Sequence, residues 1–166
     1  MTYILSAQLY LDDADEAERL WNEYHEYIEK NSKRFPPGAL SLAQSDWYYG
    51  FSDHRAPHDA WLESARFEEP ASGERNEVRC LSLRLRLLGA YHDQWLEFFY
   101  PRVFSYELAS GDSAAGHGDW LYDEFRLSPK GNLLHEIEWA DTAGTSGSRW
   151  RIEASDVEFS VYEKVA

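Results

Sequence analysis

The chain has 166 residues, a length typical of a single domain and short for two, so we treat residues 1–166 as one domain. Aromatic residues make up 16% of the chain, which excludes intrinsic disorder because so many large rings can bury a core. The formal net charge is −14, from 16 basic and 30 acidic residues. This balance argues against binding to nucleic acid and to anionic membrane surfaces, since both require basic patches.

The sequence also carries signals that bear on the cellular compartment of the protein. The N-terminal residues carry no basic region before their apolar stretch, and no run approaches the roughly 18 apolar residues of a membrane span. The single cysteine, Cys80, excludes an internal disulfide and a zinc site built from several thiolates. We therefore expect a cytoplasmic protein with no bound cofactor.

The N-terminal part predicts one strand and one helix. Apolar residues alternate over residues 2–11, which is typical of a strand. Asp13 is placed to cap a helix over residues 14–32, whose apolar residues recur in steps of three and four. The sequence Phe-Pro-Pro-Gly at residues 35–38 ends it.

The remainder of the chain has the period of two that is typical of strands. Within it, Leu81, Leu83, Leu85 and Leu87 are expected to face a core, and Pro101 predicts a bulge or an edge position. The predicted strands cover residues 46–52, 60–69, 77–88, 94–107, 118–127, 132–140, 149–154 and 157–163.

Strands and helices do not alternate, so a parallel, doubly wound sheet is not expected. The pattern predicts an α+β fold. Its expected form is a curved antiparallel sheet or partial barrel of about eight or nine strands, with one N-terminal amphipathic helix packed on it.

One candidate site is a binding surface for a protein partner. Aromatic rings surrounded by charge are typical of interaction hot spots. The alternative is that Trp120 and Tyr122 point into the core. Neighbouring strand residues face opposite ways, so Asp123 and Glu124 do not form a catalytic pair, whereas Glu136 and Glu138 share a face that we expect to be solvated. The candidate partner-binding residues are His117, Asp119, Trp120, Tyr122, Asp123 and Glu124.

A second hypothesis is a small metal-assisted hydrolase. Imidazole and carboxylate groups are ligands for zinc, iron or manganese, and several strand ends carry both. No established metal-site spacing is present, so the alternative is that these residues fill the turns before strands. The candidate ligands are His54, His58, His92, Asp93, His117 and Asp119.

A third hypothesis is a half-barrel that binds a small apolar or aromatic ligand in its interior. Its expected lining consists of Trp95, Phe99, Trp120 and Trp139.

The sequence Pro-His-Asp-Ala-Trp-Leu-Glu-Ser at residues 57–64, followed by Val-Arg-Cys-Leu-Ser-Leu-Arg-Leu at 78–85, carries a family resemblance. It resembles small bacterial families in which a His-Asp entry precedes an antiparallel meander, some of which are immunity proteins of polymorphic-toxin or contact-dependent inhibition systems. The resemblance covers residues 57–108. It implies an acidic binding protein, rather than an enzyme, that neutralises a basic toxin or other basic protein by occluding it.

Overall fold

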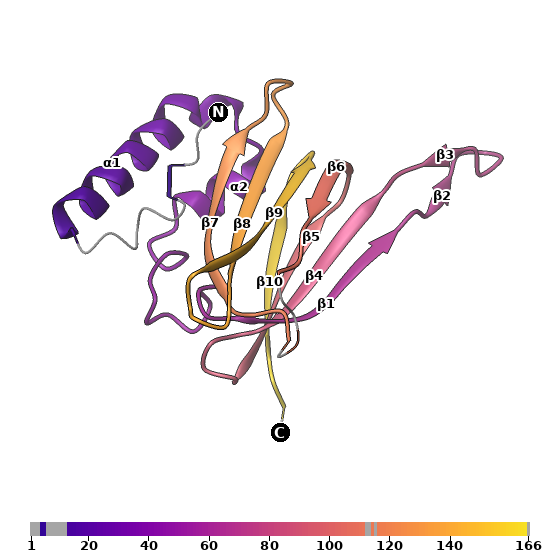
Figure 1. Ribbon diagram of the computed structural model, residues 1–166. Coiled ribbons are helices and arrows are strands. Elements are labelled where there is room, and N and C mark those ends of the chain that lie inside the picture. Colours follow the sequence, from indigo (N-terminus) through magenta and orange to yellow (C-terminus); the bar gives the residue numbers. More distant parts are fainter. Residues whose placement is uncertain (1–3, 6–12, 112–113, 115, 166) are drawn as a thin grey trace.

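The computed structural model describes residues 4–5, 13–111, 114 and 116–165 (Figure 1). Helix α1, Ala14–Asn31, begins where predicted, and the Asp13 side chain accepts hydrogen bonds from the backbone of Asp15 and Glu16. A short 3-10 helix, η2, Ser32–Arg34, continues it. The predicted strand over residues 2–11 lies outside the described residues, apart from Ile4 and Leu5.

A second helix, α2, Pro37–Ala43, was not predicted from the sequence. Its N-cap residue is Pro36, which offers no side-chain hydrogen bond. Instead, the Asp156 carboxylate accepts hydrogen bonds of 3.0 Å from the backbone of both Gly38 and Ala39. The cap is therefore supplied from more than a hundred residues away. None of the described helices is long and apolar enough to cross a membrane.

The described strands form two four-stranded sheets and one two-stranded sheet, and every paired strand is antiparallel. The orders are β1-β4-β5-β10, β2-β3 and β6-β9-β8-β7. The predicted antiparallel α+β fold is confirmed, and no sheet of the described residues closes into a barrel. The strands are β1 Trp61–Glu68, β2 Ala71–Ser72, β3 Val78–Arg79, β4 Ser82–Leu88, β5 Gln94–Tyr100, β6 Val103–Leu108, β7 Trp120–Leu127, β8 Leu133–Ala140, β9 Ser146–Ala154 and β10 Glu158–Glu163.

Three predicted segments differ from the structure. The predicted strand over 77–88 is divided into β3 and β4, which belong to different sheets. Residues 46–52 form consecutive turns instead of a strand, with Tyr48 donating its N–H to Ser45 and Gly50 donating to Trp47. The predicted strand over 94–107 is divided at Pro101, where the chain leaves the sheet of β5 and enters the sheet of β6. Pro101 lies between the two strands, outside both ladders, where its missing N–H costs no sheet hydrogen bond.

The core lies between the two large sheets. The predicted alternation of leucines is confirmed on β4, where Leu83, Leu85 and Leu87 are fully buried, whereas Leu81 precedes the strand and is half-buried. Phe98 of β5 stacks on Trp120 of β7 with ring centroids 5.1 Å apart, so the inner faces of the two sheets are in direct contact.

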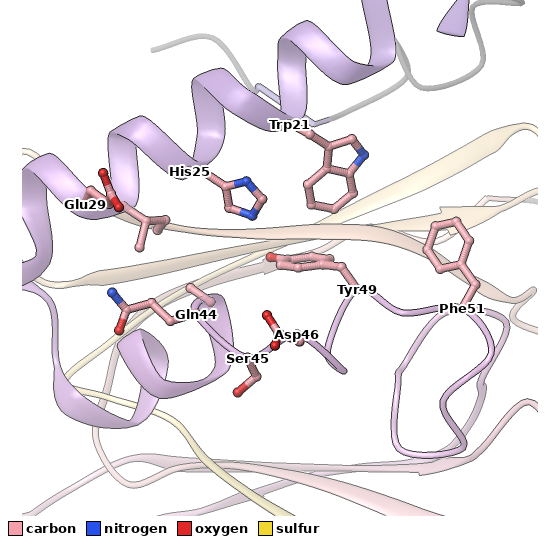
Figure 2. Close-up of a pocket in the computed structure, with 10 residues that line it drawn as sticks. Trp21, His25, Glu29, Gln44, Ser45, Asp46, Tyr49 and Phe51 are labelled. Atoms are coloured by element: carbon pink, nitrogen blue, oxygen red, sulfur yellow. The ribbon is translucent and has the colours of Figure 1, made fainter.

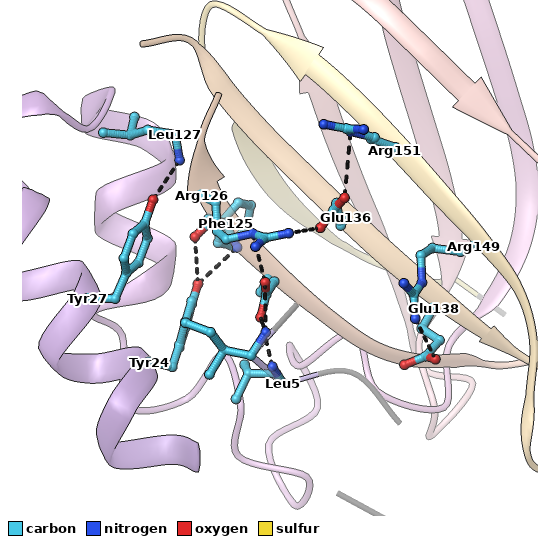
Figure 3. A network of polar contacts seen from close by, with 12 residues as sticks. Leu5, Tyr24, Tyr27, Phe125, Arg126, Leu127, Glu136, Glu138, Arg149 and Arg151 are labelled. Carbon is cyan, nitrogen blue, oxygen red and sulfur yellow. Dashed lines mark hydrogen bonds and ion pairs between the residues drawn. The ribbon is translucent and has the colours of Figure 1, made fainter. Parts of the chain in front are cut away.

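Helix α1 lies beside β7, the outer strand of its sheet (Figure 1). The Tyr24 hydroxyl accepts a 2.9 Å hydrogen bond from the Phe125 N–H and donates a 3.2 Å bond to the Phe125 carbonyl. The Tyr27 hydroxyl accepts a 2.9 Å bond from the N–H of Leu127 (Figure 3). Unpaired backbone groups of an edge strand invite pairing with other chains, so these two tyrosines both dock the helix and protect the edge.

We expect Tyr24→Phe to lower the free energy of unfolding by about 1–3 kcal/mol, because it leaves buried backbone groups of Phe125 without partners. Chemical denaturation measures the change. Tyr106→Phe is the control: Tyr106 is 51% exposed, and its change should stay within about 0.5 kcal/mol. Equal effects of the two substitutions would contradict the docking role of Tyr24.

Candidate functional site

A cleft of about 680 Å³ separates α1 from the segment that follows α2 (Figure 2). The helical spacing of Trp21, His25 and Glu29, each four residues apart, places them along one side of α1. Residues in the turns after α2 form the opposite wall. The lining residues are Trp21, His25, Ile28, Glu29, Ala43, Gln44, Ser45, Asp46, Tyr49 and Phe51.

One part of the cleft is aromatic. The rings of Trp21 and Tyr49 meet edge to face, with centroids 4.8 Å apart. The Tyr49 hydroxyl donates a 3.3 Å hydrogen bond to the Tyr24 hydroxyl, which fixes the ring against α1. Burial raises the pKa of Tyr49 well above its usual range, so this hydroxyl stays neutral at physiological pH. The aromatic wall is therefore held rigidly by the same tyrosine that docks the helix.

The polar part of the cleft is negatively charged. It carries the carboxylates of Glu29 and Asp46, and none of its ten lining residues is Lys or Arg. Helix α1, which forms one wall, contains six Asp or Glu and two Lys or Arg residues. A cleft with these groups is suited to non-covalent recognition of a positively charged group that also has an apolar surface.

The sequence analysis did not find this cleft. The helix over residues 14–32 was expected to pack on the sheet with its apolar residues, and residues 46–52 were predicted to form a strand, which would not place Tyr49 beside the helix. The visible signal was the continuation of the Trp21 stripe into the polar residues His25 and Glu29.

Half of the predicted partner-binding residues are buried, which corrects that prediction. Trp120 is 1% exposed, Asp123 2% and Glu124 0%, so these three side chains are covered by the protein itself. His117, Asp119 and Tyr122 remain partly exposed.

Asp123 belongs to an internal hydrogen-bond network. One carboxylate oxygen accepts bonds of 2.7 Å from both the Tyr48 hydroxyl and His135 Nε2, and the other accepts a 3.1 Å bond from Trp120 Nε1. His135 Nδ1 lies 2.7 Å from the Tyr100 hydroxyl. All of these groups are buried, so the network stabilises the contact between the sheets.

The predicted metal ligands are not brought into one group. His54 pairs with Asp93 at 2.6 Å on the surface. His92 lies against Trp61, with ring centroids 4.6 Å apart, and His117 lies against Trp139 and Trp150. Throughout the described part of the chain, no group of three or more His, Cys, Asp or Glu residues is arranged to hold a metal ion.

His58 and Asp119 both lie near the carboxylate of Asp59. His58 Nδ1 lies 3.1 Å from a carboxylate oxygen of Asp59, and its ring stacks on Phe51 at 4.0 Å. Burial and the nearby Asp59 carboxylate raise the pKa of Asp119, while a side-chain hydrogen bond with Trp61 opposes the shift. These contacts satisfy the loop groups locally, as the turn-filling alternative expects.

The four aromatic residues of the ligand-binding hypothesis do not share an interior. Trp120 and Trp139 are packed in the core at 1% and 0% exposure. Trp95 and Phe99 lie partly exposed on the other face of β5, where Arg86 and Arg84 cover their rings at 4.6 and 4.3 Å. The predicted half-barrel lining is therefore wrong.

The expectation of a solvated face at Glu136 and Glu138 is also wrong, because both are buried. Arg126 pairs with Glu136 and, at 2.9 Å, with Glu124 (Figure 3). Glu124 also accepts hydrogen bonds from the backbone of Ile4 and Leu5, as close as 2.8 Å for Leu5. The charged face of β7 and β8 is thus an internal ion-pair network that holds the N-terminal segment at these two residues.

No family model, curated protein or solved structure matches the chain. The function is therefore inferred from the geometry of the described residues and from the sequence.

We expect Asp123→Ala to lower the free energy of unfolding by about 3–5 kcal/mol, since it strands three buried donors. Asp93→Ala is a matched control, because it removes an Asp–His pair whose side chains are each 47% exposed. That loss should stay below about 1 kcal/mol. Urea unfolding of both variants is the measurement, and a small loss for Asp123→Ala would contradict the structural role.

Burial raises the pKa of Glu124 from 4.5 to about 7, although the Leu5 N–H and Arg126 oppose the shift. Between these values the folded protein holds a proton that the unfolded chain has released, so this group makes stability fall as pH rises from about 4.5 to 7. We expect Glu124→Gln to remove this pH-dependent part of the free energy of unfolding.

The measurement is the free energy of unfolding of both proteins from pH 5 to pH 8. The wild-type value should decline relative to that of Glu124→Gln by up to about 3 kcal/mol as the pH approaches 7. A difference that is constant with pH would contradict the raised pKa.

Proposed function

We propose that this chain is an acidic cytoplasmic binding protein of the immunity type, which neutralises a basic toxin or other basic protein by occluding it. The observation that carries the proposal is the negatively charged cleft beside the acidic helix α1. A compact protein of net charge −14 attracts basic partners over distances comparable to the Debye length.

The distribution of the negative charge supports this proposal. Carboxylates that are buried, such as Glu124 and Glu136, are paired with Arg126 inside the protein and contribute little outward field. Those on α1 are mostly exposed, including Glu18 and Glu26. A partner approaching α1 therefore meets a helix that keeps a net negative charge, although Arg19 pairs with Glu16 and Glu23. The helix lies next to a cleft that exposes aromatic surface, and this combination supplies the steering and anchoring that occlusion needs.

The test begins with capture of a partner on the immobilised protein at low salt, followed by its identification and purification. The association rate of the purified pair should fall by about 10- to 100-fold between roughly 20 mM and 500 mM salt. A stoichiometric complex should block the activity of the partner. A rate that is insensitive to salt, or a complex that leaves the partner fully active, would contradict the proposal.

Charge-reversal substitutions on α1 test whether this helix forms the partner-binding surface. Glu18→Lys combined with Glu26→Lys should slow association by about tenfold or more, because both side chains are exposed on the acidic helix. Glu69→Lys combined with Glu74→Lys makes the same change in net charge at the β2–β3 end of the molecule, away from α1 (Figure 1). Equal slowing by both pairs would show that net charge, rather than this surface, governs association.

A further inference from the structure

Three arginines of this protein share one arrangement. Each lies over an aromatic ring and also pairs with a carboxylate: Arg84 with Phe99 and Glu97, Arg86 with Trp95 and Glu63, and Arg55 with Trp47 and Asp53. The distances from the guanidinium carbon to the ring centroid are 4.3, 4.6 and 4.7 Å. The surface of this protein thus satisfies guanidinium groups with a ring and an acid together.

The cleft contains the ring and acid parts of this arrangement and supplies no arginine of its own. Figure 2 shows Trp21 and His25 directed from α1 toward Tyr49, with Asp46 on the same segment as Tyr49. We infer that the cleft binds the guanidinium group of an arginine side chain from a protein partner, with Trp21 and Tyr49 providing the aromatic surface and Asp46 and Glu29 the negative charge.

The planar shape of the guanidinium favours arginine over lysine. An arginine can place its flat face on an indole or phenol ring while its N–H groups bond a carboxylate in the same plane. An ammonium group is compact and strongly hydrated, so it gains less from an aromatic wall. The cleft volume of about 680 Å³ also accommodates the aliphatic stem and the neighbouring backbone of the bound residue.

The charges of the cleft exclude the opposite class of ligand. Glu29 and Asp46 are both exposed, and no Lys or Arg lies in the lining to receive a phosphate or carboxylate. Trp21 and Tyr49 are half-buried, so they offer a firm surface rather than freely moving rings. An uncharged aromatic ligand would leave the carboxylates unused, whereas a guanidinium can use a ring and a carboxylate at once.

The direct test uses N-acetyl-arginine-amide as the probe and follows the side-chain indole signal of Trp21 by NMR. The signal is identified by its disappearance in Trp21→Phe. The matched probe is N-acetyl-citrulline-amide, which keeps the shape and loses the charge. We expect the arginine probe to bind with a dissociation constant of about 1 mM and the citrulline probe to bind at least about tenfold more weakly.

Substitutions then separate the charged and the aromatic contributions to binding. Asp46→Asn should weaken binding of the arginine probe by about five- to tenfold. Trp21→Ala should weaken it by a similar factor, measured from the backbone amide signals of the cleft because the Trp21 indole signal is absent from this variant. Glu74→Gln, which makes the same charge change as Asp46→Asn but lies in the turn between β2 and β3, should leave it unchanged. Unchanged thermal unfolding of Asp46→Asn shows that its effect is not due to misfolding.

Several results would overturn the inference: equal binding of the citrulline probe, tighter binding of N-acetyl-lysine-amide, or arginine binding that survives both Asp46→Asn and Trp21→Ala. The inference rests on the proposed function only for the source of the arginine. A partner whose association depends on α1 charge but not on Asp46 or Trp21 would leave the function standing and remove this site. Specific arginine binding without any salt-sensitive partner would support this site and contradict the proposed function.

Discussion

The hydroxyl group of Tyr24 connects the main parts of this structure. It bonds both the N–H and the carbonyl of Phe125, so it replaces the neighbour that edge strand β7 lacks. It also accepts a hydrogen bond from the Tyr49 hydroxyl and thereby fixes one wall of the cleft. Because burial raises the pKa of Tyr24 well above its usual range, the group stays a neutral donor and acceptor throughout the physiological pH range. The position of the helix, the protection of the sheet and the shape of the cleft all depend on this one group.

The acidic side chains form two groups, buried and exposed, which have different physical roles. Asp123 and Glu124 are buried, and each accepts hydrogen bonds or ion pairs from surrounding donors, which for Glu124 offset its desolvation only in part. Removing such a donor costs stability, and the acids therefore specify how the sheets and the N-terminal residues meet. The exposed acids of α1, such as Glu18 and Glu26, take no part in these buried networks and contribute to the negative field around the helix.

Local patterns predicted the elements whose causes are local. The cap at Asp13 and the spacing of apolar residues gave the bounds of α1, and the alternation of leucines gave the buried face of β4. Helix α2 could not be predicted in this way, because its N-terminal donors are satisfied by Asp156 at the other end of the chain. The burial of Asp123 and Glu136 was missed for a similar reason, since their partners His135 and Arg126 lie on a paired strand and the pattern of one strand does not reveal what covers its polar face.

The cleft also depends on contacts that no single segment encodes. Tyr49 lies on it only because residues 46–52 turn instead of extending, and the ring is then fixed by a hydroxyl from α1. A wall that is rigid before binding requires little ordering when a side chain enters, which lowers the entropic cost of recognition. One guanidinium between one ring and one carboxylate contributes only a few kcal/mol. Under the proposed function, the cleft would therefore select the residue that anchors the partner, and tight occlusion would require the surrounding acidic surface of α1 to be covered as well.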